Sequence, residues 1–385
     1  MVIIKAVDAK SILDSRNEKT ISITINTNIG KFSASSPNGK STGKYEAKPY
    51  KKSLEGDIKK IKEFSDYFTE EKIEDFNDLK KIEDIVDRQI GANTLFALES
   101  AILKALAKEK KKEIWQIIDA KSKKFPRLVG NCVGGGKHSS NEKKPDFQEF
   151  LLIPKTNSPS KAFEINKSIK KKVEISLKIA DEKFEARKND ENAWETFLNE
   201  KQVLEVLERY KIPLGLDIAS SGFYKRRKYH YLNPKLDRTA EEQLSYVSNL
   251  IKNFNLFYIE DPFGEEDFES FAKLLEKFPN SLIVGDDLTT TNPKRLERAI
   301  KEKSINALII KPNQIGPLTK VAEVCEIAKK NNMVIVFSHR SGETDESILA
   351  DLAFGFGADF LKCGITGKER EVKIKRLIEI EKTFK

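Results

Sequence analysis

LFYIE at residues 256–260, LIVGD at 282–286 and ALIIK at 307–311 are three short apolar runs that each end in a charged residue. The charged ends recur every 25 or 26 residues, and an earlier run, LGLD at 214–217, ends in Asp217 in the same way. This period accommodates one strand, one helix and two short loops. Apolar runs at such spacing, with helix-like segments between them, are typical of the parallel strands of an α/β fold.

The charged residues at these run ends predict a functional site. In a closed (β/α) barrel the C-terminal ends of the strands meet at one mouth, where barrel enzymes carry out their chemistry. Asp217, Glu260 and Asp286 would converge there, and carboxylate oxygens without His or Cys suit Mg²⁺ rather than zinc. One such acid could instead cap the following helix, but three in successive units favour a metal site. Lys311, which ends the next run, is a candidate base.

The length of 385 residues predicts two domains, because it exceeds the size at which one hydrophobic core usually stops growing. Residues 1–125 show a strand pattern followed by amphipathic helices, which predicts an N-terminal α+β domain. Residues 126–385 are then the barrel. Its strands are expected at 150–154, at a poorly marked segment 187–190, and before six polar ends: Asp217, Glu260, Asp286, Lys311, Ser338 and Lys362.

The net charge of +9 raises the question of a nucleic-acid surface. The lysines alternate with glutamates, as in KEKKKE at 108–113, which is typical of solvated helix faces. We therefore expect no nucleic-acid partner. No apolar stretch approaches the roughly 18 residues that a membrane helix needs, and residues 1–5 lack the layout of a signal peptide. We expect a cytoplasmic protein without a membrane partner.

Seven segments resemble the enolase family, and they follow the family's order along the chain. They are ILDSR (12–16), PNGKSTGKYEA (37–47), DIASS (217–221), IEDPF (259–263), DDLTTTNP (286–293), KPNQIG (311–316) and SHRSGET (338–344). The resemblance implies a modified (β/α)8 TIM barrel of ββαα(βα)₆ layout with an N-terminal α+β capping domain. It also implies a lyase of glycolysis and gluconeogenesis that interconverts 2-phosphoglycerate and phosphoenolpyruvate, and at least a homodimer.

The resemblance assigns metal and base roles. Asp217, Glu260 and Asp286 match the ligands of one Mg²⁺, and Ser41 matches a ligand of a second, substrate-dependent Mg²⁺, so two ions per active site are expected. Lys311 matches the base that removes the C2 proton. Nearby cations should lower the pKa of this lysine, so that a neutral amine is available.

Further matched positions surround the expected phosphorylated substrate. Lys362 matches a lysine that contacts the substrate carboxylate and stabilises the intermediate. Arg340 and Ser341 match the phosphate contacts, a role that suits a guanidinium fork. Glu149 matches a site acid that could share a proton with the general acid. The remaining matched positions are two histidines, a glutamine and a loop glycine: His138, His339, Gln148 and Gly39.

The sequence departs from the family where the acid that helps the C3 hydroxyl leave is expected. The family carries Gly-Asp-Glu-Gly-Gly there, whereas residues 189–194 read NDENAW. The acidic pair places Glu191 in the general-acid role, with Asp190 and Glu195 as the next candidates. Loss of the glycines would remove positive-φ conformations and could change the pocket near C3.

Because of this loop, two alternatives to the 2-phosphoglycerate lyase stay open. One is a related lyase of the enolase superfamily that acts on another phosphorylated or carboxylated hydroxy acid. The other is a non-catalytic protein built on the same fold. Nearly every matched position carries the residue type that the chemistry requires, which favours an enzyme.

Overall fold

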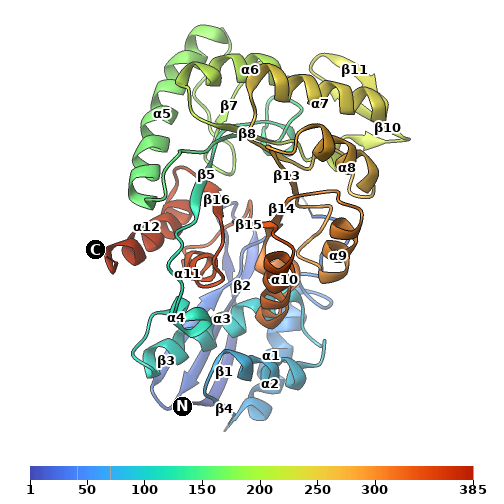
Figure 1. Ribbon diagram of the computed structural model, residues 1–385. Helices are drawn as coiled ribbons and strands as arrows, with labels where there is room; N and C mark the ends of the chain where they lie inside the picture. The colour runs from blue at the N-terminus through green and yellow to red at the C-terminus, as the bar shows by residue number, and fades with distance from the viewer. Residues whose placement is uncertain (41, 70, 385) are drawn as a thin grey trace.

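The computed structural model describes residues 1–40, 42–69 and 71–384. The N-terminal part is an antiparallel sheet of order β3-β2-β1-β4, covered by helices (Figure 1). In β2, alternate residues such as Ile21, Ile23 and Ile25 are buried, as expected when one face of a sheet packs against helices. The elements are β1 (Val2–Leu13), β2 (Lys19–Thr27), β3 (Gly30–Ser35), β4 (Lys72–Ile73), α1 (Leu54–Phe68), α2 (Leu79–Val86), α3 (Ala92–Glu109) and α4 (Ile114–Asp119).

The rest of the chain forms an eight-stranded barrel that is closed by pairing of its last strand with its first. Seven strands run parallel to one another, and the second strand is antiparallel to both of its neighbours. The strands are β5 (Arg127–Gly134), β6 (Glu149–Leu152), β8 (Leu214–Asp217), β12 (Tyr258–Glu260), β13 (Leu282–Gly285), β14 (Ala307–Ile310), β15 (Val334–Ser338) and β16 (Phe360–Gly364).

Among the described residues, eight helices surround the barrel, from α5 and α6 at the top of Figure 1 to α10 and α11 near its middle. Two of them follow the first strand pair, and each later strand is followed by one helix, so the predicted ββαα(βα)₆ layout is confirmed. The helices are α5 (Pro159–Ala180), α6 (Glu200–Leu207), α7 (Ala240–Phe254), α8 (Phe268–Lys277), α9 (Pro293–Lys301), α10 (Leu318–Lys330), α11 (Ile348–Gly355) and α12 (Lys368–Lys382). Among the described residues, no helix is long and apolar enough to cross a lipid bilayer.

The predicted barrel strand at 187–190 is wrong. This segment is a loop with a single bridge between Lys188 and Trp194, and the strand that completes the barrel is β5. Its sequence, RLVGNCVG, contains two glycines and an asparagine, which weaken the strand signal. Gly130 is required nonetheless, because a Cβ there would lie 2.6 Å from the Ile365 side chain.

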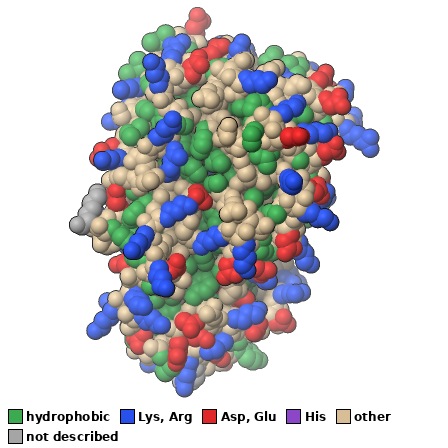
Figure 2. Space-filling model, viewed as in Figure 1, with side chains coloured by type: hydrophobic (Ala, Val, Ile, Leu, Met, Phe, Trp, Pro, Cys, Tyr) green, Lys and Arg blue, Asp and Glu red, His purple; other side chains and the backbone are tan. Residues whose placement is uncertain are grey.

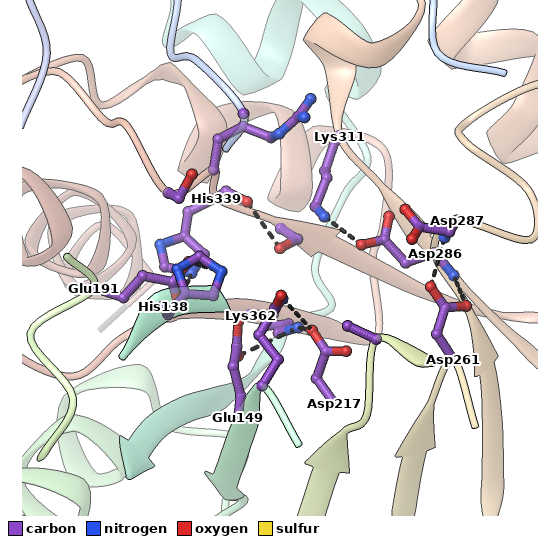
Figure 3. A pocket seen from close by; sticks show the side chains of 16 residues that line it. His138, Glu149, Glu191, Asp217, Asp261, Asp286, Asp287, Lys311, His339 and Lys362 are labelled. Atoms are coloured by element: carbon purple, nitrogen blue, oxygen red, sulfur yellow. Dashed lines mark hydrogen bonds and ion pairs between the residues drawn. The ribbon is translucent and has the colours of Figure 1, made fainter. Parts of the chain in front are cut away.

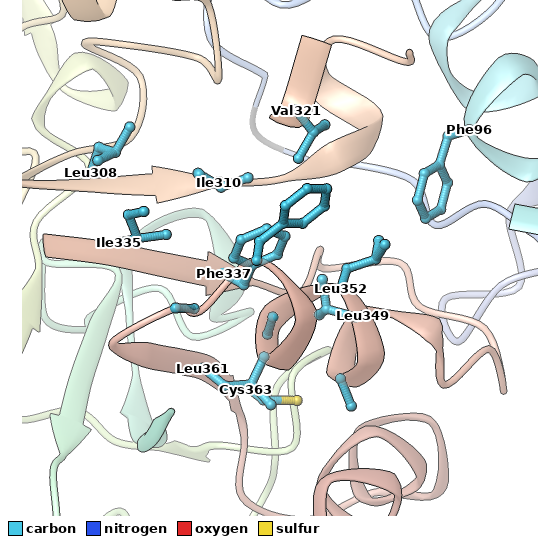
Figure 4. Packing of buried hydrophobic residues seen from close by; sticks show 14 of the residues in the cluster. Phe96, Leu308, Ile310, Val321, Ile335, Phe337, Leu349, Leu352, Leu361 and Cys363 are labelled. Carbon is cyan, nitrogen blue, oxygen red and sulfur yellow. The ribbon is translucent and has the colours of Figure 1, made fainter. Parts of the chain in front are cut away.

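Side chains of the barrel strands alternate between two cores, as the two-residue period of a strand requires. Ala307 and Ile309 of β14 belong to a small inner cluster with side chains from the other strands. Leu308 and Ile310 face outward and pack with Val321 of α10 (Figure 4). Phe96 of α3 lies beside this outer cluster, so the N-terminal domain packs directly on the barrel.

The surface carries both signs of charge. On the face seen in Figure 2, basic and acidic side chains are interspersed rather than gathered by sign. Several pairs lie at helical i, i+4 spacing, such as Lys178 with Glu174 and Lys273 with Glu269. Such pairs are typical of a solvated helix face.

Phe354 of α11 should be a major contributor to stability. Its ring centroid lies 4.9 Å from that of Trp115, 4.7 Å from Phe125 and 5.5 Å from Phe384. Phe354→Ala would leave a cavity in this cluster, so we expect the free energy of unfolding to fall by about 3–5 kcal/mol. Urea denaturation measures this change. Ile179→Ala is the control, because Ile179 is 79% exposed; equal losses in both variants would contradict the packing described.

Candidate active site

A polar cavity lies at the mouth of the barrel, where the C-terminal ends of the parallel strands meet (Figure 3). β6 runs in the opposite direction, so its first residue, Glu149, reaches the same mouth. Gly39 reaches the cavity from the N-terminal domain. The lining residues are Gly39, His138, Gln148, Glu149, Glu191, Asp217, Ala219, Asp261, Asp286, Asp287, Lys311, Ser338, His339, Arg340, Ser341 and Lys362.

Two lysines hold the three predicted metal ligands. The Lys362 ammonium lies 2.8 Å from Asp217 Oδ2 and 2.8 Å from each carboxylate oxygen of Glu260. It also lies 3.3 Å from Glu149 Oε2. The third predicted ligand, Asp286, forms an ion pair with Lys311. Glu260 is fully buried and accepts a further hydrogen bond of 2.7 Å from Tyr258.

The site carries more negative than positive groups. Among the described residues, six carboxylates, two lysine ammonium groups and one arginine guanidinium line the cavity. Burial, and then the Asp217 carboxylate, raise the pKa of Glu260 to about 8. Burial, and then Glu191, hold the pKa of Glu149 well above its usual range. This unbalanced set of oxygen donors fits a hard divalent cation such as Mg²⁺.

Asp261 fixes the backbone that carries Asp286 and Asp287, a role that the sequence patterns did not predict. Its two carboxylate oxygens accept hydrogen bonds from the backbone N–H groups of Asp286 (2.9 Å) and Asp287 (2.7 Å). The adjacent acids in IEDPF and DDLTT were the available signal. The neighbour of Asp286 in the second segment, Asp287, is half-buried and lines the cavity. Burial and Asp286 raise its pKa to about 8.

Lys311 has a raised pKa in the chain alone. Burial is the largest single effect and lowers the pKa of Lys311, but the nearby carboxylates, Asp286 first and then Glu260, together raise it above its usual range, so the ammonium form is favoured. The direction is opposite to the one expected beside bound cations. The pKa is raised rather than lowered because the negative charge of Asp286 acts directly on the Lys311 ammonium.

Glu191 lies inside the cavity, between two histidines (Figure 3). Its Oε2 accepts a hydrogen bond of 2.9 Å from Asn131 Nδ2 and lies 3.7 Å from His339 Nε2. Its Oε1 lies 3.9 Å from His138 Nε2. Burial raises the pKa of Glu191, but nearby groups, His138 first and also Arg370, lower it well below its usual range. Glu149, to which Glu191 is hydrogen-bonded, is shifted the opposite way.

Arg340 is held by the N-terminal domain. Its Nη2 donates to both carboxylate oxygens of Glu46, at 2.9 and 3.1 Å, a contact that the sequence did not suggest. Gly39 is required beside it, because a Cβ at this position would lie 1.9 Å from the guanidinium. Ser341 Oγ accepts hydrogen bonds of 2.8 Å from Lys40 N and from Arg16 Nη1.

The other predicted site residues form fewer contacts with one another. Gln148 Nε2 lies 3.4 Å from Asp217 Oδ2. His138 Nδ1 is hydrogen-bonded to Asp190 Oδ1 at 2.7 Å, and this bond places Asp190 behind the histidine rather than in the cavity. Glu195 is bonded to Ser140 and does not line the cavity. Ser41, the predicted ligand of a second metal ion, lies outside the described residues.

Comparison with known proteins decides the family. The family model of the enolase C-terminal TIM barrel domain matches residues 122–385, and that of the enolase N-terminal domain matches residues 4–118. The chain belongs to the enolase family. The enolase of Natronomonas pharaonis is 34% identical over 99% of both chains, and that of Methanosphaera stadtmanae is 34% identical over 98% of this chain and 97% of the relative. The enolase of Pyrobaculum aerophilum is 36% identical over 82% of this chain and 76% of the relative.

Family membership confirms the resemblance to enolases that the seven segments indicated, and it confirms the predicted fold. It also confirms the enzyme class, a lyase of the phosphopyruvate hydratase type.

For an enolase family member, the 189–194 loop has an unusual sequence but keeps a tight turn. Asn189 Oδ1 accepts hydrogen bonds from the N–H groups of Glu191 (3.0 Å) and Ala193 (2.9 Å). Asn192 adopts φ 61°, a left-handed conformation that asparagine tolerates better than most residues. Two asparagines thus replace two of the three expected glycines and Ala193 replaces the third, and the expected loss of positive-φ conformations does not occur at Asn192.

Proposed function

We propose that the protein interconverts 2-phosphoglycerate and phosphoenolpyruvate by removal of the C2 proton and loss of the C3 hydroxyl. The observation that carries the proposal is the placement of a base and an acid in one cavity. Figure 3 shows Lys311 on one side and the Glu149–Glu191 pair on another. A substrate between them would present C2 to the amine and its C3 hydroxyl to a carboxyl group.

The proposal includes Mg²⁺ held by Asp217, Glu260 and Asp286, with Ser41 at a second ion. Bound Mg²⁺ would stabilise the negative charge that develops on the substrate carboxylate when the C2 proton leaves. The surplus of buried carboxylates supports this assignment. Asp261 would keep Asp286 in place through its backbone contacts.

Lys311 must be neutral to accept the C2 proton. Its raised pKa depends on the contact with Asp286, so any cation that shares the Asp286 charge lowers the pKa of the amine. Lys362, now surrounded by Asp217, Glu260 and Glu149, would remain an ammonium and attract the substrate carboxylate. The two lysines thus have different roles because their carboxylate surroundings differ.

The Glu149–Glu191 pair would supply the proton for the leaving hydroxyl. The opposite pKa shifts support a proton on Glu149 and an ionised Glu191 before substrate binds. Transfer of this proton along the hydrogen bond from Glu149 to Glu191 makes Glu191 the acid. Glu191 would then give this proton to the C3 hydroxyl oxygen as the C3–O bond breaks with its electrons on that oxygen, which leaves as water. The electron pair left at C2 after proton removal would form the C2=C3 double bond of phosphoenolpyruvate.

We expect Glu191→Gln to lose product formation by about 10²–10⁴-fold, the range typical of general acid catalysis. The variant should still exchange the C2 hydrogen with deuterated solvent, because Lys311 is intact. Product absorbance and proton NMR of 2-phosphoglycerate measure the two steps. Glu195→Gln is the matched control, since Glu195 lies near this loop but outside the cavity. Near-normal turnover by Glu191→Gln would show that another group is the acid.

A related lyase on another phosphorylated or carboxylated hydroxy acid is the second candidate function. The observation that favours it is the Asn189–Asn192 turn, which differs from the family's glycine loop beside the position proposed for C3. Exchange of the C2 hydrogen of 2-phosphoglycerate with solvent distinguishes the two candidate functions. Absence of C2 exchange with 2-phosphoglycerate at saturating Mg²⁺ would favour the second.

A further inference from the structure

Arg370 of α12 is a fully buried cation directly behind the active site. Among the described residues, its guanidinium donates hydrogen bonds to carbonyl oxygens rather than to a carboxylate. Nη2 lies 3.1 Å from Asp190 O and 2.5 Å from Ser341 O, and Nη1 contacts Arg340 O. Arg370 thus joins the 189–194 loop to the residues after β15. Its ion pair with Glu369 is long, with 3.6 Å between Arg370 Nε and Glu369 Oε1. A buried charge that is held mainly by carbonyl dipoles is costly, so this arrangement calls for an explanation.

The same guanidinium contacts a site histidine. Arg370 Nη1 lies 2.8 Å from His339 Nδ1. Arginine can only donate hydrogen bonds, so Nδ1 must present a lone pair. Burial holds the pKa of His339 well below its usual range, even though Glu191 opposes this effect. A neutral His339 with a bare Nδ1 carries its proton on Nε2.

The Nε2–H group of His339 points to Glu191 and the cavity. Nε2 is buried, has no hydrogen-bond partner among the described side chains, and lies 3.7 Å from Glu191 Oε2. Gly364 makes room for this arrangement, since a Cβ there would lie 2.6 Å from Glu191 O and 3.1 Å from Arg370 Cγ. An unpaired buried donor beside a carboxylate is available to a group that enters the cavity.

We propose that Arg370 is a positioning residue with two effects. It fixes His339 as its Nε2–H tautomer, and it anchors the Asp190 carbonyl. His339 and Glu191 are then held so that both contact the same substrate atom. The proposal rests on the proposed function, because it assigns His339 the role of a neutral hydrogen-bond donor beside the general acid. Arg370 itself does not line the cavity. It acts only through the residues that it holds.

The tautomer can be measured without substrate, so its failure is separate from failure of the proposed reaction. The chain has only three histidines. His138 Nδ1 and His230 Nδ1 each face an aspartate at 2.7 Å, and both should carry a proton on that nitrogen. His230 Nε2 also faces an acceptor, Lys225 O at 3.0 Å, so a proton on Nε2 alone does not identify the signal of His339 and the bare Nδ1 is the decisive feature. A long-range ¹H–¹⁵N spectrum of protein labelled in histidine should therefore show one histidine with a bare Nδ1 and a protonated Nε2. A spectrum in which all three carry a proton on Nδ1 would overturn the proposal.

Arg370→Met removes the donor to Nδ1. We expect the bare-Nδ1 pattern to disappear and kcat to fall by about 10–100-fold, the range typical of partners that orient a site residue, with a smaller change in KM. Arg376→Met is the matched control on the same helix, because Arg376 pairs with Asp351 at 2.8 Å and lies away from His339. It should lower stability and leave the His339 signals unchanged.

Two further outcomes decide the proposal. An Arg370→Met protein with wild-type His339 signals, or with a loss of kcat no larger than that of Arg376→Met, would overturn it. If Arg370→Met does not fold, Arg370→Gln is the second variant, because it keeps a polar side chain but removes the charge and shortens the reach to Nδ1, and the same shift of the tautomer is expected. If neither variant folds, the wild-type spectrum alone decides whether His339 has the predicted tautomer.

Discussion

Lys311→Ala should abolish both formation of phosphoenolpyruvate and exchange of the C2 hydrogen of 2-phosphoglycerate with deuterated solvent. The C2 proton is very weakly acidic, so its removal needs a positioned base. Lys311 is placed by the end of β14 and by its ion pair with Asp286. Loss of the amine should therefore stop the reaction before any later group can act. Proton NMR of the substrate in deuterated buffer follows the exchange directly.

Lys320→Ala is a suitable control for this variant. Lys320 pairs with Glu323 on the surface of α10, one helix after Lys311, and its side chain is 49% exposed. This variant should keep wild-type exchange and turnover. Wild-type C2 exchange in a folded Lys311→Ala protein would show that another group removes the proton.

Removal of divalent cations should also abolish turnover, and Mg²⁺ should restore it. Asp286→Asn should fold yet bind Mg²⁺ at least about 100-fold more weakly, because residues that only support metal ligands already change affinity by about 10–100-fold. The substitution keeps the side-chain shape but removes the charge that a hard cation requires. Titration calorimetry with Mg²⁺ alone measures the affinity in the absence of substrate.

Asp345→Asn is the control for the metal prediction. Asp345 is exposed and pairs with Lys368 away from the cavity. Its variant should bind Mg²⁺ as the unmodified protein does. Equal Mg²⁺ affinities of Asp286→Asn and Asp345→Asn would show that Asp286 is not a metal ligand. Full activity in excess chelator would contradict metal dependence itself.

The sequence predicted the parts of the site that are local in the chain. Asp217, Glu260 and Lys311 each end an apolar run, and a barrel necessarily brings such ends to one mouth. The strand period therefore sufficed to place them. Strand β5 was missed because its glycines and Asn131 hide the apolar pattern.

Other parts depend on contacts that no local pattern records. Glu46 meets Arg340 across the two domains, and Arg370 meets His339 from a different barrel unit. The sequence at 189–192 suggested a lost turn, because glycines were expected at positions that carry asparagine. Asn189 makes side-chain hydrogen bonds there instead, and Asn192 adopts the left-handed conformation.

The most direct test of the account is a single assay of the purified protein with 2-phosphoglycerate and Mg²⁺, followed by the ultraviolet absorbance of the enol product. The cavity brings together a base, an acid pair and a surplus of carboxylates. The account therefore predicts a rise in absorbance that stops when excess chelator is added and resumes with fresh Mg²⁺. No absorbance change from folded protein at saturating Mg²⁺ and substrate would contradict it.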